Sequence, residues 1–115
     1  RDERVVAAVE SGKISLNLNP EKQNPHIYGS PAYDEKEHKS YFTVSIEELQ
    51  EIVSRYHGTG EIMIKPNGQM KEILAVDKEI GVVVNDNGTP IERTNRITVH
   101  YSKKRTHVVP AKRKR

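Results

Sequence analysis

The chain of 115 residues is 34% apolar, with five Tyr, one Phe and no Trp, which suits a single domain with a thin core and excludes a large sandwich. It contains no Cys and no long apolar run, which excludes a disulfide framework, a zinc ribbon, a thiol nucleophile and a membrane helix within this sequence. The formal net charge is +3, and residues 103–115 hold seven Lys and Arg and no acid, which favours a polyanionic partner such as RNA, DNA or an acidic protein.

The N-terminal residues are expected to form one helix and one extended segment. Residues 1–10 are compatible with a helix, with Val5, Val6 and Ala8 able to face inward. Apolar and polar residues then alternate over 14–18, which predicts a short strand or an extended segment.

Residues 19–40 are expected to form a long polar loop, because they hold three prolines, a glycine and many polar residues. One helical turn is expected at its start, since Asn19 can cap it and Pro20 suits the first helical position. Long ordered loops in small domains are often functional.

The strongest local signal is a helix over residues 44–58. Ser45 and Glu48 form a capping-box pattern, and His57–Gly58 supplies a stop. The apolar residues repeat at helical spacing and give one buried face; they are Leu49, Ile52, Val53 and Tyr56.

After this helix the apolar period changes from 3.6 to 2, which predicts strands separated by Asn-Gly turns. The expected strands are 61–65, 71–76, 80–84, 96–102 and 106–110, with a turn over 85–90. The predicted fold class is therefore α+β, with an N-terminal helical and loop segment and one well-capped helix packed on an antiparallel sheet of four to five strands. Residues 1–110 would form one domain, and 111–115 (AKRKR) a basic tail that equally fits a solubilising or appended segment.

Side chains in the strand 96–102 are expected to alternate between the core and a polar face. Ile97, Val99 and Tyr101 belong to the core side. The polar side carries Arg96, Thr98, His100 and Ser102. Across the next turn, His107 returns on a paired strand, and the tip of that turn carries Lys103, Lys104 and Arg105.

A face of imidazoles, hydroxyls and cations has the groups that metal-free RNA cleavage needs. One group removes the proton of the ribose 2′-OH, another protonates the departing 5′-oxygen, and cations stabilise charge on the phosphate. The same pattern also fits an ordinary solvent-facing strand, where polar alternation is common.

The other histidines are weighed in the same way. His26 lies in a proline-constrained loop, where either a functional or a surface role fits. His38 sits among charged residues and is expected at the surface. His57 is expected to be structural, because a positive imidazolium suits a helix C-terminus. No metal site is predicted, because the sequence has no H-E-x-x-H, H-x-H or EF-hand pattern.

Three blocks carry a family resemblance: NPEKQNPHIYGSPAY (19–33), SYFTVSIEELQEIVSRYHGTGEI (40–62) and TNRITVHYSKKRTHVVP (94–110). Over about residues 12–110 the chain resembles the polymorphic toxin type 50 domain, which also occurs at the C-termini of phage minor head proteins. The matching positions, besides the 45–58 helix, are Gln23, His26, Gly29, Ser40, His100, Tyr101, Ser102, His107 and Pro110. Arg105 stands where a small residue such as glycine is expected in the final turn, which puts the geometry of that turn in question.

The resemblance implies an α+β ribonuclease toxin of the barnase, EndoU, colicin and RelE type. The catalytic candidates are His26 and His107 as acid and base, supported by His100, Tyr101 and Ser102. The candidate phosphate contacts are Lys13, Lys22, Arg96, Lys103, Lys104 and Arg105. The alternative is a non-catalytic module, either phage head-associated or nucleic-acid-binding.

No cofactor is expected. The expected partners are RNA and a dedicated acidic immunity protein, with no membrane partner, and the domain is expected to be a monomer. The implied location is bacterial, with secretion or delivery into the cytoplasm of a target cell, or association with phage.

Overall fold

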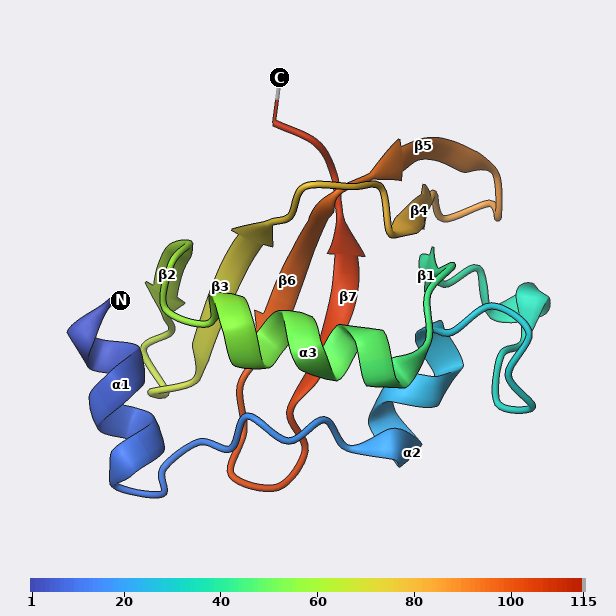
Figure 1. Cartoon of the computed structure of the whole chain (residues 1–115). Helices are drawn as coiled ribbons and strands as arrows, with labels where there is room; N and C mark the ends of the chain where they lie inside the picture. Colours follow the sequence, from blue (N-terminus) through green and yellow to red (C-terminus); the bar gives the residue numbers. More distant parts are fainter. Residues whose placement is uncertain (115) are drawn as a thin grey trace.

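The computed structural model describes residues 1–114 and has an α+β fold, as expected (Figure 1). Its helices are α1 (Glu3–Glu10), α2 (Pro20–Gln23) and α3 (Ile46–Tyr56), with the 3-10 turns η1 (Asn24–His26) and η2 (Glu35–Glu37). Its strands are β1 (Tyr41–Phe42), β2 (Glu61–Ile64), β3 (Met70–Ala75), β4 (Gly81–Val84), β5 (Pro90–Thr94), β6 (Arg96–His100) and β7 (His107–Ala111).

The helix starts follow their predicted caps. The Ser45 hydroxyl accepts a hydrogen bond from the Glu48 backbone N–H at 3.1 Å and begins α3. The Asn19 side chain accepts one from the Lys22 N–H at 3.0 Å and begins α2. Helix α3 ends at Tyr56, with His57 as its C-cap and Gly58, at φ +80°, after it. These local signals placed both helices correctly.

The N-terminal residues also follow expectation. Val5 and Ala8 are buried on α1, while Val6 is half-buried. Residues 14–18 form no strand and instead run as an extended segment beside the turn between β6 and β7. The backbone N–H of Ser15 donates to the Ser102 carbonyl at 2.9 Å.

The strands form two antiparallel sheets, in the orders β2-β3-β6-β7 and β1-β4-β5, where a single sheet was expected. Strand β5 departs from the sequence prediction, which has a turn over 85–90 and no strand between that turn and residue 96. A turn at Asn85–Thr89 folds the chain back: Asn85 Oδ1 accepts from the Thr89 N–H at 2.9 Å, and Gly88 has φ +87°. Strand β5 begins with Pro90 at a sheet edge, which is where a strand tolerates proline.

Helix α3 crosses one face of the four-stranded sheet, as Figure 1 shows. The core lies between them and includes Leu49, Ile52, Val53, Leu74, Ile97, Val99 and Val108. On the opposite face the side chains are only half-buried, as at Ile73, Thr98, His100 and Val109. The alternation predicted for β6 is therefore confirmed, and it leaves one sheet face accessible.

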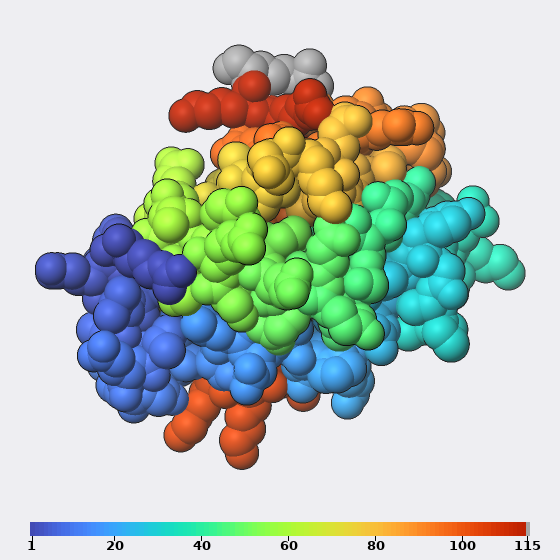
Figure 2. Space-filling model, viewed as in Figure 1, coloured from blue at the N-terminus to red at the C-terminus, as the bar shows by residue number. Residues whose placement is uncertain are grey.

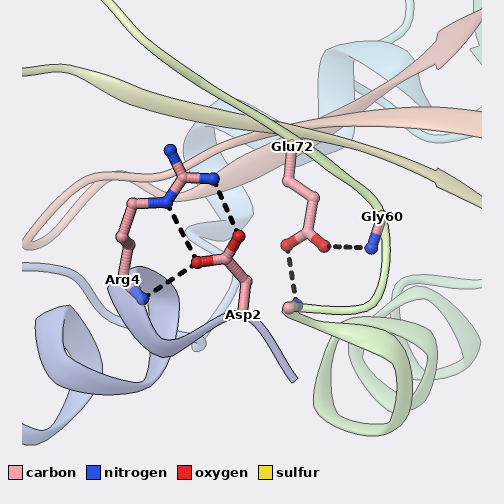
Figure 3. Close-up of polar contacts among 5 residues, drawn as sticks. Asp2, Arg4, Gly60 and Glu72 are labelled. Carbon is pink, nitrogen blue, oxygen red and sulfur yellow. Dashed lines mark hydrogen bonds and ion pairs between the residues drawn. The ribbon is translucent and has the colours of Figure 1, made fainter.

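A buried carboxylate fixes the turn after α3 to the sheet (Figure 3). Glu72 of β3 is fully buried, and its two oxygens accept hydrogen bonds of 2.8 Å from the backbone N–H groups of Gly58 and Gly60. The Tyr101 hydroxyl donates to the same carboxylate at 2.7 Å. Because all three donors are satisfied by one acceptor group, Glu72 serves the fold.

The two ends of the β6–β7 hairpin lie far apart in the molecule. In the space-filling view the 102–106 turn, in orange, protrudes at the bottom, while the last described residues, in red, lie at the top (Figure 2). Lys103, Lys104 and Arg105 are exposed on this turn.

Candidate active site

Three histidine rings gather at one end of the accessible sheet face. His100 ends β6, His107 begins β7, and His26 ends η1. The ring centroids of His100 and His107 are 5.0 Å apart with an interplanar angle of 12°. Those of His26 and His107 are 6.3 Å apart at 15°. We call these three residues the histidine cluster.

The β-sheet register explains two members of the cluster. His100 and His107 are directly opposite partners in the β6–β7 pair, so their side chains share a face. Lys71 of β3 is in turn the partner of His100. A row of one lysine and two imidazoles therefore crosses three strands.

Gln23 explains how His26 reaches this row. Gln23 is fully buried, and its side-chain amide donates to the Val108 carbonyl at 2.9 Å while its carbonyl accepts from the Val108 N–H at 2.7 Å. These two bonds join α2 and η1 to β7 next to His107. The sequence shows Gln23 as a position that matches the family resemblance, but it does not predict this structural role.

Backbone carbonyls orient two of the rings. His26 Nδ1 lies 2.9 Å from the Ser40 carbonyl oxygen, and His107 Nδ1 lies 3.1 Å from that of Arg105. A carbonyl only accepts, so the geometry assigns the proton of each neutral ring to Nδ1. The Nε2 atom of each ring is then left to accept or donate a proton in chemistry.

The environment favours the neutral form of all three rings. Burial is the largest cause lowering the pKa of His26, His100 and His107 below the usual 6.5. It lowers the pKa of His100 to about 4, with further contributions from His107 and Lys71.

Five cations surround the cluster closely enough to lower these pKa values: Lys22, Lys39, Lys65, Lys71 and Arg105. Of these, Lys22 and Arg105 were candidates from the sequence. Lys39, Lys65 and Lys71 were missed. The sequence does predict a strand that contains Lys71, over 71–76. Only the pairing of β3 with β6 shows that Lys71 lies opposite His100.

The other candidate cations are not among the groups that lower these pKa values. Lys13 is exposed in the segment after α1, and Lys103 and Lys104 are exposed on the 102–106 turn. Arg96 shares the face of His100 but begins β6, and its guanidinium donates to the Lys112 carbonyl at 3.1 Å.

The two hydroxyl candidates do not point into the cluster. Tyr101 is 2% exposed and bonded to Glu72, and burial raises its pKa further above its usual value. Strand β6 ends at His100, so Ser102 lies in the following turn, where its hydroxyl accepts from the Arg105 N–H at 3.2 Å. Ser102 was expected on the polar face of a strand that runs to residue 102. It lies beyond that face because β6 ends two residues earlier.

Arg105 fits the turn without strain. Among the non-glycine residues of 1–114, only His38 has a positive φ, so the Arg105 backbone does not need glycine. Side-chain bonds from Ser102 and from the buried Thr106 hold the turn instead; Thr106 Oγ1 accepts from the Ser102 N–H at 2.9 Å.

The remaining histidines lie outside the cluster. His38 is exposed, as expected, and its Nδ1 donates to the Asp86 carbonyl at 2.8 Å. His57 is buried and structural, with Nδ1 2.9 Å from the Val53 carbonyl. Its Nε2 lies 2.7 Å from the Arg1 guanidinium, which can only donate. The ring therefore joins Arg1 to the C-terminal end of α3, which agrees with the structural role expected for His57.

A cavity of about 460 Å³ lies on the α3 side. Its lining includes four carboxylates, Glu47, Glu48, Glu51 and Asp77, against two cations, Arg55 and Lys78, a balance that repels a polyanion. Within residues 1–114, no group of three or more His, Cys, Asp or Glu side chains is placed to hold a metal ion. No helix in that range combines the length and apolar content needed to cross a membrane.

Fold and site together define a small α+β domain with a cation-lined histidine face. A family model described as Bacterial toxin 50 matches residues 18–110, and the chain belongs to this family of toxin domains. No curated protein matches the chain. The ribonuclease subgroup and the link to phage minor head proteins stay predictions.

Proposed function

We propose that this toxin domain is an endoribonuclease that cleaves RNA without a metal ion. The observation that carries the proposal is the histidine cluster, in which His26 and His107 have Nε2 atoms left for proton transfer amid five cations. Membership of the toxin family agrees with a destructive activity of this kind.

RNA supplies its own nucleophile in this mechanism. One imidazole takes the 2′-OH proton as O2′ attacks phosphorus, and the other gives a proton to O5′ as the P–O5′ bond breaks. The products are a 2′,3′-cyclic phosphate and a 5′-OH. His26 and His107 take the two roles, and Lys22, Lys39 and Arg105 stabilise the charge that develops on the phosphate.

One imidazole must be protonated to act as the acid. A bound phosphate places negative charge among the cations of the cluster, and an opposite charge favours the imidazolium form. Substrate binding therefore prepares the acid. His100, with its low pKa, stays neutral and stacks against the His107 ring.

The family suggests two further features of this function. A toxin domain of this kind is expected to have a cognate immunity protein, and we infer that its binding surface is acidic, because the face it must block is lined by Lys and Arg. Delivery of the domain into target cells belongs to the same proposal.

The test is incubation of the purified domain with RNA in the presence of a chelator, followed by mapping of the product ends. We expect cleavage with 2′,3′-cyclic phosphate ends, and none at a nucleotide that lacks the 2′-OH. His26→Ala and His107→Ala should each lower the rate about 100-fold or more. Lys78→Ala, on the α3 side and paired with Glu48, is the matched control and should cleave normally.

Two results would contradict the proposal. If both histidine variants still cleave RNA, the histidine cluster is not the active site. Salt-sensitive RNA binding by the wild-type chain with no cleavage would instead support the non-catalytic, nucleic-acid-binding module.

A further inference from the structure

Three tyrosines form a partly exposed aromatic cluster beside the histidine cluster. The ring centroids of Tyr28 and Tyr41 are 5.1 Å apart, those of Tyr28 and Tyr33 5.4 Å, and those of Tyr33 and Tyr41 5.6 Å. The Tyr28 side chain is 62% exposed. Aromatic rings that only fill a core are buried, so the exposed Tyr28 ring needs another explanation.

The tyrosines line a cavity of about 170 Å³, which we call the tyrosine cavity. Its wall also includes Glu35, His38 and Lys39. The cavity therefore combines flat apolar rings with a few groups able to hydrogen-bond, the composition typical of small-ligand sites. Neither the family assignment nor the mechanism above uses it.

Two observations place the tyrosine cavity next to the histidine cluster. His26 Nδ1 lies 2.9 Å from the carbonyl oxygen of Ser40, and the two chain neighbours of Ser40, Lys39 and Tyr41, both line the cavity. Lys39 lines the cavity and is also close enough to His26 and His107 to lower their pKa. A ligand in the cavity can thus be continuous with a phosphate at the histidines.

We propose that the tyrosine cavity binds an unpaired nucleobase of the nucleotide next to the cleaved phosphate. The inference rests on the proposed ribonuclease function and adds a base-binding subsite to it. Tyr28 supplies a stacking surface, which suits any base because every base has a π-face. Lys39 contacts the phosphate that joins this base to the cleaved nucleotide. Glu35 and His38 offer hydrogen bonds to the base edge.

The test uses an RNA oligonucleotide with 2′-O-methyl groups, which binds but has no free 2′-OH to attack. The chain has no Trp, so its ultraviolet emission comes from tyrosine and should be quenched by a stacked base. We expect Tyr28→Ala to lose most of this quenching and to bind about 5- to 150-fold more weakly. Tyr28→Phe should keep the affinity, because it keeps the ring.

Tyr56→Ala is the matched control, because Tyr56 lies on α3 and outside the cavity. A second arm needs no mutation: oligonucleotides with one abasic position are scanned along the sequence. One abasic position should weaken binding to the wild-type chain by the same factor and have no effect on Tyr28→Ala.

The outcomes separate the two proposals. Full cleavage by the wild-type chain, with equal kcat/KM for Tyr28→Ala and for every abasic substrate, would overturn the base subsite and leave the ribonuclease intact. Quenching and abasic sensitivity without any cleavage would support the subsite as an RNA-binding feature and overturn the ribonuclease. Loss of quenching in Tyr56→Ala alone would place the base on α3 and overturn the subsite.

Discussion

At the level of single residues, the protonation of His100 links the site to stability. Its pKa falls to about 4 in the folded domain from a usual value of 6.5. Between these values the unfolded chain binds a proton at His100 that the folded domain does not. The stability that neutral His100 contributes is therefore complete above pH 6.5 and is lost as the pH falls toward 4. His26 and His107 act in the same direction, because their pKa values are lowered too.

We expect the free energy of unfolding to decrease as the pH falls from 6.5 to 4, and to decrease less in His100→Asn, because asparagine does not titrate. Urea unfolding at several pH values, followed by circular dichroism, measures both slopes. Carboxylates affect both chains equally, so the difference in slope isolates His100. Equal slopes in the two chains would show that His100 titrates normally in the folded domain.

At the level of elements, the Gln23 side chain joins the α2–η1 segment to β7 through its two hydrogen bonds to Val108. Replacing it by leucine, which has a similar volume, leaves a buried N–H and a buried carbonyl of Val108 without partners. Each such loss costs about 1 to 3 kcal/mol, so Gln23→Leu should lower the free energy of unfolding by about 2 to 6 kcal/mol. Because His26 would separate from His107, cleavage should fall as well.

Gln69→Leu is the control for this substitution, since Gln69 is exposed and its side chain makes no hydrogen bond to residues 1–114. Denaturant unfolding measures stability, and cleavage is assayed under conditions where both variants are fully folded. A stable Gln23→Leu domain with normal cleavage would show that the buried amide does not position His26.

Elements encoded by neighbouring residues could be predicted from the sequence. The Ser45 cap and the apolar period fixed α3, and the period-2 pattern placed β6 with Ile97 and Val99 inward. The missed strand β5 illustrates the limit. Its sequence, PIERT, begins with proline and is largely polar, because an edge strand needs no apolar face on both sides and no donor at its first residue.

The same limit applies to the candidate site. The expected hairpin already places His100 and His107 on paired strands, because a short turn joins the two strands directly. The position of Lys71 depends on the pairing of β3 with β6, and that of Lys39, just before β1, depends on the pairing of β1 with β4. Such long-range pairings leave no local pattern, so the cation set was only partly predictable.

At the level of the whole molecule, basic residues lie at both ends of the β6–β7 hairpin. Lys103 and Lys104 are exposed on the turn near the histidine cluster. At the other end, Arg113 forms an ion pair of 2.7 Å with Glu79; the last residue of the predicted basic tail, Arg115, lies outside the described residues. Of these two ends, the turn is the one that adjoins the histidines. It is therefore the end placed to bind RNA that continues from the histidine cluster.

Replacing Lys103 and Lys104 together by serine should therefore lower the affinity for RNA. It should also make that affinity less sensitive to the salt concentration. For single strands, each lost phosphate contact lowers the slope of log affinity against log salt by about 0.7. Binding isotherms at several salt concentrations measure this slope. Arg113→Ser, at the far end of the hairpin, should leave it unchanged. If Arg113→Ser has the larger effect, RNA follows the opposite end of the sheet.

The Gln23 amide has one more consequence, for what the domain can join. Strand β7 is the last strand of its sheet, and the outward N–H and carbonyl of Val108 are the groups that another chain would use to add a strand. Gln23 already occupies both, so β7 is sealed against edge-to-edge aggregation at this point. A partner that adds a strand to this domain must therefore do so at another edge, such as β2 or β5.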